Sequence, residues 1–574
     1  MTQLRTLLET RLGEAFDDVA GVGSNPMLRR SQHADFQADG ALAAARRAGV
    51  NPRELAARVV ERAALDELCS SVEISGPGFI NLTVRDAVLA DLVTRVSRDA
   101  RLGVAPAENA QTVIVDYSAP NVAKEMHAGH LRSTIIGDAA VRVLEWRGHT
   151  VIRRNHIGDW GTPFGMLIEH LLDLGENEAA HELSMGDLNS FYRTARAKFD
   201  VSEEFKDRSR RRVVLLQGGD ADTLRLWKIL IGESQKYFLT VYDRMDVTLT
   251  EEDFAGESSY NPLLDSVSEE LERLGLAKDS NGALCVFPAG FTGREGEPLP
   301  LIVRKSDGGY GYAATDLAAI RHRLREMGAA RILYVVGSPQ QQHLNMVYQT
   351  ARDAGWLTAP ASAEHVGFGS VLGADGKMLK SRSGEAVKLI DLLDEAVTRA
   401  AAVVAEKNPD LDDAERAAVA NAIGIGAVKY ADLSTDRIKD YTLDFDRMLS
   451  FEGNTAPYLQ YAHARIHSVF RRAGVEPDRH GGELELTETA ERELALALLE
   501  FPGIVAEVEQ TLQFHKLAGY LSDLASVFTS FYEKCPILRS AEEVRDSRLV
   551  LCAVTAQILA QGLHLLGVRA PKRM

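Results

Sequence analysis

The pattern of hydrophobic and polar positions changes character along the chain, and its first part mixes two periodicities. Residues 52–68 have the spacing of an amphipathic helix, whereas residues 78–84 form a short β-like run after the turn sequence Ser-Gly-Pro-Gly at 75–78. This mixture predicts a small α/β domain over residues 1–110. A polar stretch at 105–111 then precedes a new start.

The middle of the chain opens with a strand, a loop, a helix and a second strand. The apolar run Val113–Val115 predicts the first strand, a helical pattern follows from about Gly129 to Arg147, and Val151–Ile152 begins the next strand. This order favours a parallel sheet that binds ligands at the carboxyl ends of its strands. We expect further strands at 299–303, 332–336 and 365–372, and a charged helical insertion near 165–250.

Strand patterns vanish from about Leu389 onward, and long apolar-periodic helices replace them. We expect helices that include residues 392–405, 458–470 and 490–512. The chain is therefore predicted to be an α/β multidomain protein with a Rossmann-like parallel-sheet domain, a helical insertion and an all-α C-terminal bundle. The predicted boundaries are 1–110, 111–388, 389–450 and 451–574.

Length and composition fit a soluble, folded protein of several domains. The 574 residues suggest three or four domains, and 45% hydrophobic with 26% charged residues is ordinary for globular chains. The N-terminus lacks the pattern of a signal peptide, and no segment approaches 18 uninterrupted apolar residues, so we expect a cytoplasmic protein without a membrane partner.

The net charge of −17 argues against a protein that coats DNA or other nucleic acid nonspecifically, because such binding relies on clustered Lys and Arg. Two local basic clusters remain, and each is either a solvated surface or an RNA contact. They consist of Lys206, Arg208, Arg210, Arg211 and Arg212, and of Arg569, Lys572 and Arg573.

The four cysteines predict neither disulfides nor a structural zinc site. Cys69, Cys285, Cys535 and Cys552 are scattered, with no CxxC pair and no His at a zinc-ligand spacing. We expect reduced thiols that are mostly buried.

Two histidines mark the start of the long helix that follows the first predicted strand of the middle part. His127 and His130 lie in the sequence HAGH, where free backbone N–H groups and the helix dipole favour an anion. Gly129 would let a nucleotide approach the backbone. Two such histidines can equally form a metal pair or an ordinary polar surface.

A second candidate phosphate site follows the turn at Gly373–Gly376. Lys377, Lys380 and Ser381 come directly after this Gly-rich hinge, which could let ammonium groups close over phosphates. The alternative is a solvated charged turn.

These two motifs resemble the paired signatures of class I aminoacyl-tRNA synthetases. HAGH resembles HIGH with Ala128 in place of Ile, and KMLKS resembles KMSKS with Leu379 in place of Ser. The longer strings YSAPNVAKEMHAGHLRSTIIGD and NHIGDWGTPFG, which begin at Tyr117 and Asn155, resemble the arginyl family. The resemblance implies a catalytic role for His127, His130 and Lys380, and an ATP site made of Lys124, His127, Gly129, His130, Lys377, Lys380 and Ser381.

An arginine pocket needs carboxylates in fixed geometry, because a guanidinium is planar, permanently charged and rich in donors. Asp116 ends the first strand of the predicted sheet, and Tyr312 and Asp316 are four residues apart. The resemblance assigns arginine binding to Asp116, Asn121, Tyr312, Asp316 and Gln340. A strand-ending Asp is otherwise often a turn residue, and a Tyr is often part of the core.

Strings near both termini also resemble the arginyl family. FEGNTAPYLQYAHARI from Phe451 and the ending GVRAPKRM resemble its anticodon-binding domain, and GPGFINL near Phe79 resembles its N-terminal domain, which contacts the tRNA elbow. The implied tRNA contacts are Asn81, Tyr458, Tyr461, Tyr532 and Met574. Bases stack on aromatic rings, although aromatic residues at helical spacing are often core.

The resemblance implies ATP-dependent ligation of L-arginine to its cognate tRNA through arginyl-adenylate, with release of AMP and pyrophosphate. It also implies Mg²⁺ with the ATP, a tRNA requirement for activation, and contact of residues 389–450 with the tRNA stem. We expect a monomer. Two alternatives stay open, namely a relative that uses another amino acid or nucleotidyl acceptor and a non-catalytic RNA-binding paralogue.

Overall fold

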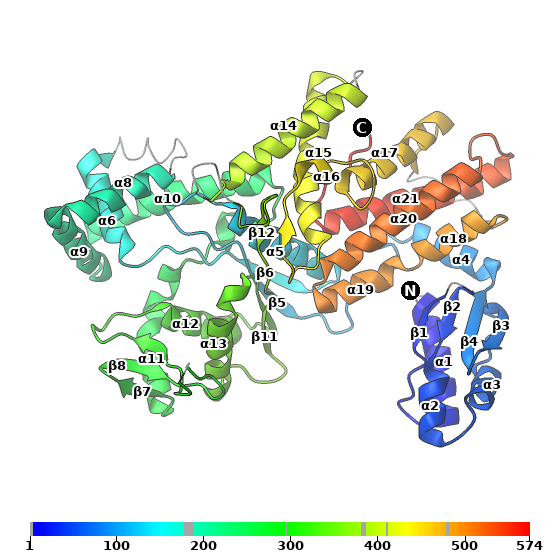
Figure 1. The fold of residues 1–574 in the computed structure, drawn as a ribbon, viewed down its shortest axis with the longest axis horizontal. Helices are drawn as coiled ribbons and strands as arrows, with labels where there is room; N and C mark the ends of the chain where they lie inside the picture. The colour runs from blue at the N-terminus through cyan, green and yellow to red at the C-terminus, as the bar shows by residue number, and fades with distance from the viewer. Residues whose placement is uncertain are drawn as a thin grey trace. The chain divides into compact units, whose positions relative to one another are not determined.

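The computed structural model describes residues 4–31, 33–176, 188–293, 295–379, 386–408, 411–477 and 483–574. Within these residues the chain forms two compact units (Figure 1). The terminal unit contains residues 1–106, 450–564 and 569–574, and the central unit contains residues 107–449 and 565–568. Lys380 and Ser381 lie outside the described residues.

The terminal unit begins with the small α/β fold expected from the sequence. Its antiparallel sheet has the order β1-β2-β4-β3. The strands are β1 (Leu28–Arg30), β2 (Phe36–Ala38), β3 (Cys69–Ser75) and β4 (Phe79–Val84), and the helices are α1 (Leu4–Ala20), α2 (Gly40–Ala48), α3 (Pro52–Ala63) and α4 (Asp86–Ser97). Ile80, Leu82 and Val84 are all buried, as the period-two pattern of β4 predicts.

The rest of the terminal unit is a helical bundle. It consists of α17 (Ala456–Ala473), α18 (Thr489–Leu498), α19 (Phe501–Thr511), α20 (Phe514–Lys534) and α21 (Glu542–Leu565). The single helix expected over 490–512 is wrong, because Pro502 starts a new helix in the first turn of α19. By length and composition α21 could cross a membrane, but 78% of its apolar window is buried in the protein, as in a core helix.

A partly buried ion pair joins the two sequence-distant halves of the terminal unit. Both Nη atoms of Arg492 in α18 donate to the two carboxylate oxygens of Asp35, each at 2.7 Å. Arg492 Nε donates to Asp86 at 2.8 Å. Such fork-like pairs fix orientation as well as charge.

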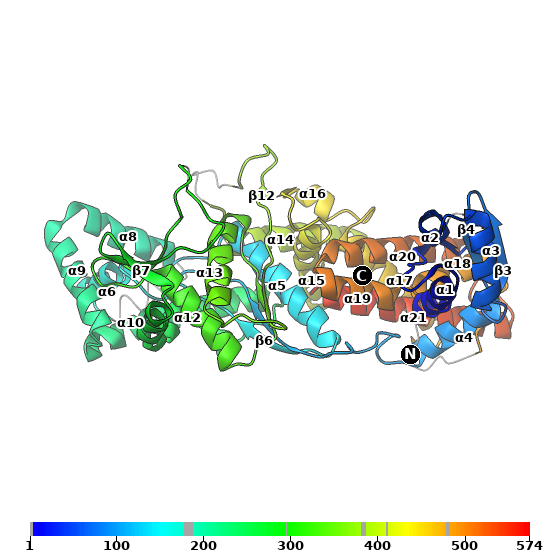
Figure 2. The same cartoon turned by 90° about the horizontal axis from the view of Figure 1, so that it is seen from below.

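The central unit contains the parallel sheet predicted from the β-loop-α-β pattern. Its strand order is β11-β10-β5-β6, and all three pairings are parallel. The strands are β5 (Thr112–Asp116), β6 (Thr150–Arg154), β10 (Arg331–Tyr334) and β11 (Ser362–His365). Helices α12 (Tyr312–Arg325) and α13 (Gln341–Asp353) lie on one side of the sheet and α5 (Ala128–Trp146) on the other (Figures 1 and 2).

Two of the expected strands differ from the prediction, and a strand occurs where none was expected. The run at 299–303 forms β9 (Leu301–Arg304) in a separate antiparallel sheet with β7 (Ala277–Ser280) and β8 (Ala283–Val286). The run at 365–372 is interrupted, and its end forms β12 (Val371–Leu372). A strand also occurs after Leu389, because β13 (Tyr441–Thr442) pairs with β12 in parallel. A strand of two residues is too short to show an alternation of apolar and polar positions. Its pairing with a distant segment therefore cannot be predicted from the local sequence.

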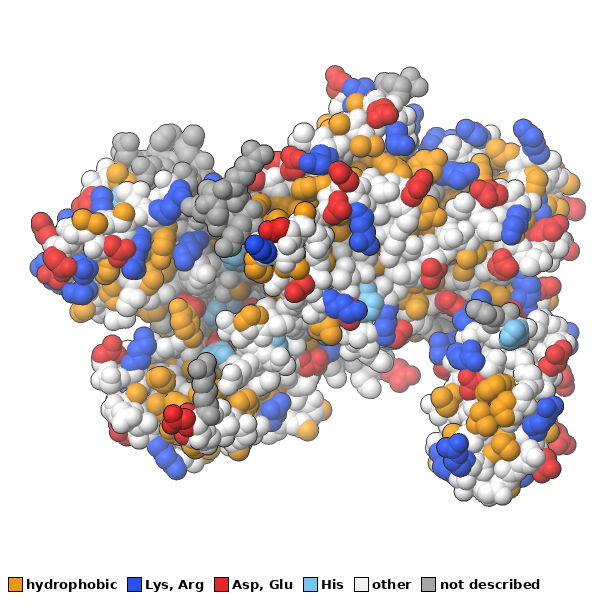
Figure 3. All heavy atoms as spheres, viewed as in Figure 1, with side chains coloured by type: hydrophobic (Ala, Val, Ile, Leu, Met, Phe, Trp, Pro, Cys, Tyr) orange, Lys and Arg blue, Asp and Glu red, His pale blue; other side chains and the backbone are white. Residues whose placement is uncertain are grey.

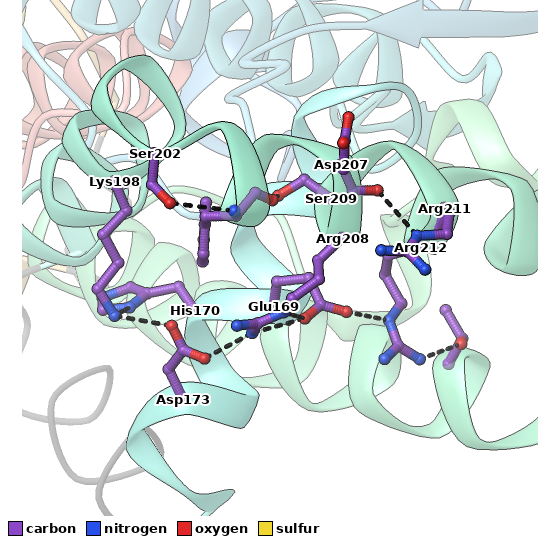
Figure 4. A network of polar contacts seen from close by, with 12 residues as sticks. Glu169, His170, Asp173, Lys198, Ser202, Asp207, Arg208, Ser209, Arg211 and Arg212 are labelled. Carbon is purple, nitrogen blue, oxygen red and sulfur yellow. Dashed lines mark hydrogen bonds and ion pairs between the residues drawn. The ribbon is translucent and has the colours of Figure 1, made fainter.

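The expected helical insertion is present and is held by an internal ion-pair network (Figure 4). Buried Glu169 accepts hydrogen bonds from Arg208 Nε at 2.8 Å and from Arg212 Nε at 2.7 Å. Arg208 and Arg212, two members of the predicted basic cluster, therefore stabilise the packing of the insertion's own helices. Its helices are α6 (Pro163–Leu174), α8 (Leu188–Val201), α9 (Glu203–Gln217) and α10 (Ala221–Arg244).

The remaining elements of the central unit are shorter 3-10 turns and the helices that follow the sheet. The turns are η1 (Glu251–Asp253), η2 (Glu257–Leu263) and η3 (Ser338–Gln340). The helices are α11 (Leu264–Arg273), α14 (Leu389–Lys407), α15 (Asp413–Leu433) and α16 (Phe445–Met448).

A buried ion pair connects α5 to α15. Arg132 Nε donates to Asp432 at 3.0 Å, and the two side chains are 1% and 0% exposed. The other two guanidinium nitrogens of Arg132 donate to the carbonyls of Lys439 and Arg437. These carbonyls belong to the segment that leads into β13, so Arg132 connects α5 to the β12–β13 ladder.

We expect Asp432→Asn to destabilise the central unit by about 3–5 kcal/mol, because it leaves the buried Arg132 guanidinium without a counter-charge. The midpoint of urea unfolding measures this loss. Asp200→Asn is the control, since it breaks an exposed pair with Arg196 whose side chains are 55% and 52% exposed, and should cost about 0.5 kcal/mol or less. Equal shifts for the two variants would contradict the prediction.

Candidate active site

The HAGH histidines cap the helix on which they lie. His127 is the N-cap of α5, and its Nδ1 accepts a hydrogen bond from the backbone N–H of Gly129 at 3.0 Å. His130 is the third helical residue, and its Nδ1 accepts from the backbone N–H of His127 at 3.1 Å. The spacing of the two histidines is thus that of a reciprocal capping box.

This capping fixes the protonation of both rings. A ring nitrogen that accepts a backbone N–H carries no proton, so neutral His127 and His130 must each carry their proton on Nε2. Burial and the neighbouring His127 lower the pKa of His130 to about 3, which keeps this ring neutral at physiological pH. The helix start therefore offers two Nε2–H donors that an anion could use.

Gly129 is required by the position of the His127 ring. A Cβ at residue 129 would lie 2.7 Å from His127 Cε1 and 2.9 Å from His127 Nδ1. The sequence suggested that this glycine lets a nucleotide approach, and the structure adds a packing reason for it.

The loop that leads into α5 holds a strained backbone. Ser118, Ala119 and Ala123 have φ of 72°, 48° and 57°, in the left-handed region that non-glycine residues rarely adopt. Side-chain acceptors bind the N–H group of each: Ser133, Asn155 and Ser234 respectively. Such strain costs about 1–3 kcal/mol per residue and persists where the surroundings fix it, which is typical of functional sites. No residue pattern in the sequence indicated this feature.

Backbone pairing holds the described part of the second lysine motif and, separately, residues 387 and 388. Within it, Met378 forms a bridge with Leu372, and Leu379 N–H donates to Val371 O at 3.2 Å. After it, Lys388 forms a bridge with His127, and Ala128 N–H donates to Val387 O at 3.0 Å. Residues 387 and 388 therefore pair directly with the start of the HAGH segment.

Glu125 connects the loop before HAGH to α8 and to Lys388. Its buried carboxylate accepts hydrogen bonds from Asn189 Nδ2 at 2.6 Å and from Lys388 Nζ at 3.0 Å. Next to it, the exposed Lys124 places its Nζ 4.5 Å from the centroid of the Tyr192 ring. Asn189 and Tyr192 both lie on α8, so the insertion contacts the loop that precedes HAGH.

The residues predicted to bind arginine lie at the carboxyl edge of the parallel sheet or beside it. Asp116 is the last residue of β5 and pairs in register with Tyr334, the last residue of β10. The exposed Asn121 follows β5 and forms a bridge with Gly158, and the exposed Gln340 follows β10. The structure thus brings Asp116, Asn121 and Gln340 to one edge, as ligand-binding residues of such sheets require.

Asp316 has a partner that the sequence did not assign to it. His343 Nε2 lies 2.6 Å from Asp316 Oδ2, and the two side chains are 30% and 25% exposed. This hydrogen bond to Asp316 raises the pKa of His343. Tyr312 begins α12 one turn before Asp316 and is 74% exposed, so its ring is free to pack on a planar ligand.

Glu257 is a further acid near this group. Burial, followed by the charges of Asp159 and Asp316, raises the pKa of Glu257 to about 8. The Glu257 side chain is therefore largely neutral at pH 7. Sequence reasoning missed it because nothing in its local pattern distinguishes it from a surface acid.

Histidine side chains show in the hollow between the insertion and the region of α11 to α13 (Figure 3). Among the residues that the structure describes, no group of three or more His, Cys, Asp or Glu is arranged to hold a metal ion. All four cysteines are free and buried, as expected.

The predicted RNA contacts lie in the terminal unit. The C-terminal tail runs along α17, where Gln460 Nε2 donates to Arg569 O at 2.7 Å and His463 Nδ1 lies 2.9 Å from Pro571 O. Tyr461 on the same helix is 46% exposed. The other candidates, Asn81, Tyr458, Tyr532 and Met574, are partly buried, and Arg465 stacks on Tyr532 at 4.1 Å.

Family models match most of the chain in three consecutive blocks. The model described as the arginyl tRNA synthetase N-terminal domain matches residues 2–84, that of the class I (R) tRNA synthetase catalytic domain matches 92–445, and that of the DALR anticodon-binding domain matches 459–574.

Whole-chain comparisons agree with these matches. The chain is 57% identical to an arginine–tRNA ligase of Thermobifida fusca over 100% of this chain and 99% of that protein. It is 49% identical to one of Streptomyces avermitilis over 100% of both. Among solved structures, arginyl-tRNA synthetases of Plasmodium falciparum and Thermus thermophilus match with TM-scores of 0.85 and 0.82, at 28% and 25% identity, over 100% of both chains.

The capped HAGH helix, the pairing of residues 387 and 388 with its start and these matches lead to one conclusion: the chain belongs to the arginyl-tRNA synthetase family of class I aminoacyl-tRNA synthetases.

Proposed function

We propose that this chain activates L-arginine with ATP to form arginyl-adenylate and pyrophosphate, and then transfers arginine to its cognate tRNA with release of AMP. The observation that carries the site assignment is the backbone pairing of residues 387–389 with residues 126–128. Residues 387–389 follow the lysine motif by a few positions in the sequence, which supports the proposal that groups from both motifs act on the same triphosphate.

The first step needs little more than positioning and charge stabilisation. The carboxylate of arginine attacks the α-phosphorus of ATP, and the bond to the pyrophosphate oxygen breaks. The Nε2–H groups of His127 and His130, the start of α5, and the ammonium groups of Lys124, Lys377 and Lys380 are assigned to the phosphate oxygens as negative charge shifts. Gly129 and Ser381 complete the proposed ATP site, and Mg²⁺ enters with ATP as part of the substrate.

In the absence of substrate, each acidic side chain proposed to recognise arginine either pairs with a basic side chain or carries a proton. Asp316 pairs with His343, Glu257 holds a proton, and the Asp116 carboxylate pairs with Arg323. A guanidinium at Asp316 would replace the imidazolium as its charge partner. Tyr312 would cover the guanidinium plane, and Asn121 and Gln340 would hold the amino and carboxylate groups of the substrate.

The acceptor is tRNA, and the terminal unit is proposed to bind it. Tyr458, Tyr461, Tyr532 and Met574 are assigned to the anticodon loop, where each stacked base would contribute about 1 to 3 kcal/mol. Asn81 is assigned to the tRNA elbow, and residues 389–450 to the stem. We further propose a cytoplasmic monomer that needs tRNA for the activation step.

The purified chain, given ATP, tRNA and each amino acid in turn, is expected to charge arginine in preference to all others, because only a cationic planar group satisfies the proposed carboxylates. Aminoacylation with labelled amino acids measures this. Lys380→Ala should slow activation about a hundredfold, and Lys377→Ala should slow it less. Preference for another amino acid would overturn the substrate assignment, and an unchanged activation rate in Lys380→Ala would remove Lys380 from the phosphate role.

We expect His127→Asn to lower the rate of activation by about 10²–10³-fold without lowering thermal stability. Asn is a good N-cap, so the start of α5 is kept while the Nε2–H donor is lost. Pyrophosphate exchange in the presence of tRNA and a thermal melt measure the two properties. His127→Ala is the comparison, since it should lose both activity and about 1 kcal/mol of helix capping. Full activity in His127→Asn would show that the His127 ring only caps the helix and does not act on the phosphates.

The KM for arginine should fall as pH rises from about 6 to 9, by up to about tenfold per pH unit while one proton is displaced. The pKa of His343 is raised, so its imidazolium competes for Asp316 until the pH passes that value. Glu257, with a pKa of about 8, then ionises and favours the cation further.

Steady-state aminoacylation at saturating ATP and tRNA gives this profile, and two variants separate its parts. His343→Asn should flatten the lower-pH part, and Glu257→Gln should flatten the part near pH 8. A profile that neither variant alters, or an equal trend in the KM for ATP, would contradict the assignment.

A further inference from the structure

Helix α12 directs two functional side chains to the same face. Asp316 and Arg323 are seven residues apart, which is two helical turns, so they lie above one another on α12. Asp316 is in the first turns of the helix, beside His343. Arg323 lies deeper, where its Nη2 is 2.6 Å from Asp116 Oδ2, and its side chain is 0% exposed.

The surroundings of Arg323 are unusual for so buried a cation. Its guanidinium carbon lies 5.2 Å from the centroid of the Tyr334 ring. Apart from the contact of Nη2 with Asp116, the Arg323 nitrogens Nε and Nη1 have no hydrogen-bond partner within the described residues, and neither do the buried hydroxyls of Tyr334 and Tyr348. Asp116 is therefore the ion-pair partner on which this guanidinium depends.

Stability alone does not account for this arrangement. Taking two charges out of water costs several kcal/mol per ion, and a well-packed apolar pair of similar volume would often be as stable or more stable. A carboxylate needed at this point of the sheet, however, requires a counter-charge that substrate cannot displace. Arg323 meets that requirement because solvent and ligand do not reach it.

We propose that Arg323 is a positioning residue for arginine recognition, which holds the Asp116 carboxylate at the end of β5 by its Oδ2 atom without touching the substrate. This rests on the proposed role of Asp116 in the arginine pocket. Arg323 and His343 then have different roles. Arg323 is a permanent partner of Asp116, whereas the substrate can displace His343 from Asp316.

A double-mutant cycle on the full chain tests this role. The variants are Arg323→Met, which removes the charge and keeps much of the volume, Asp116→Asn, and the two combined. For each, aminoacylation gives kcat and the KM values for arginine, ATP and tRNA, active-site titration gives the functional fraction, and a thermal melt gives the stability.

Arg323→Met should raise the KM for arginine about tenfold or more, with the KM values for ATP and tRNA within about twofold of wild type. In the Asp116→Asn background the same change should add little, because the two residues act as a unit. Arg323→Lys keeps the charge and loses the planar fork, so its KM for arginine should be intermediate.

Three results would overturn the proposal: additive effects of the two substitutions on the KM for arginine, a parallel rise in the KM for ATP, or a loss confined to the functional fraction. If Arg323→Met does not fold, Arg323→Lys and the double variant, which lacks both charges, decide the question by the same KM comparison. A wild-type chain that fails to charge arginine would instead refute the proposed function, which separates the two failures.

Discussion

The buried pair between Arg132 and Asp432 is the constraint on which the proposed active site depends. Arg132 lies two residues after HAGH, so a single side chain connects the capped start of α5 to α15 and to the carbonyls before β13. The β13 strand pairs with β12, and the lysine motif follows β12 in the chain after the turn at 373–376. Any displacement of this pair would move the helix start proposed to bind phosphate relative to the β12–β13 ladder, with which the described part of the lysine motif pairs.

The local parts of this arrangement were predictable from the sequence, because they depend on short-range patterns. The run Val113–Val115 predicted β5, and the position of HAGH after it predicted a helix start at the ligand edge. Asp116 could be placed at that edge for the same reason. The family resemblance supplied roles for these positions, and the comparisons confirm the family.

Features that depend on distant contacts were not predictable in this way. No spacing rule connects Asp116 to Arg323, which is 207 residues later in the numbering, or Arg132 to Asp432, which are 300 residues apart. The capping role of His127 and His130 was also missed, although its spacing is local. Imidazoles are uncommon in capping boxes, so the pattern suggested only a ligand site.

The pairing of Arg492 with Asp35 bears on how the chain is made. The two residues are 457 positions apart, and residues 107–449 of the central unit are synthesised between them. At about 5–20 residues per second, Asp35 leaves the ribosome roughly 20 to 90 s before its partner exists. During translation the N-terminal part of the unit is therefore without the bundle that completes it, and in this interval chaperones and neighbouring nascent chains can reach the residues that Arg492 later contacts.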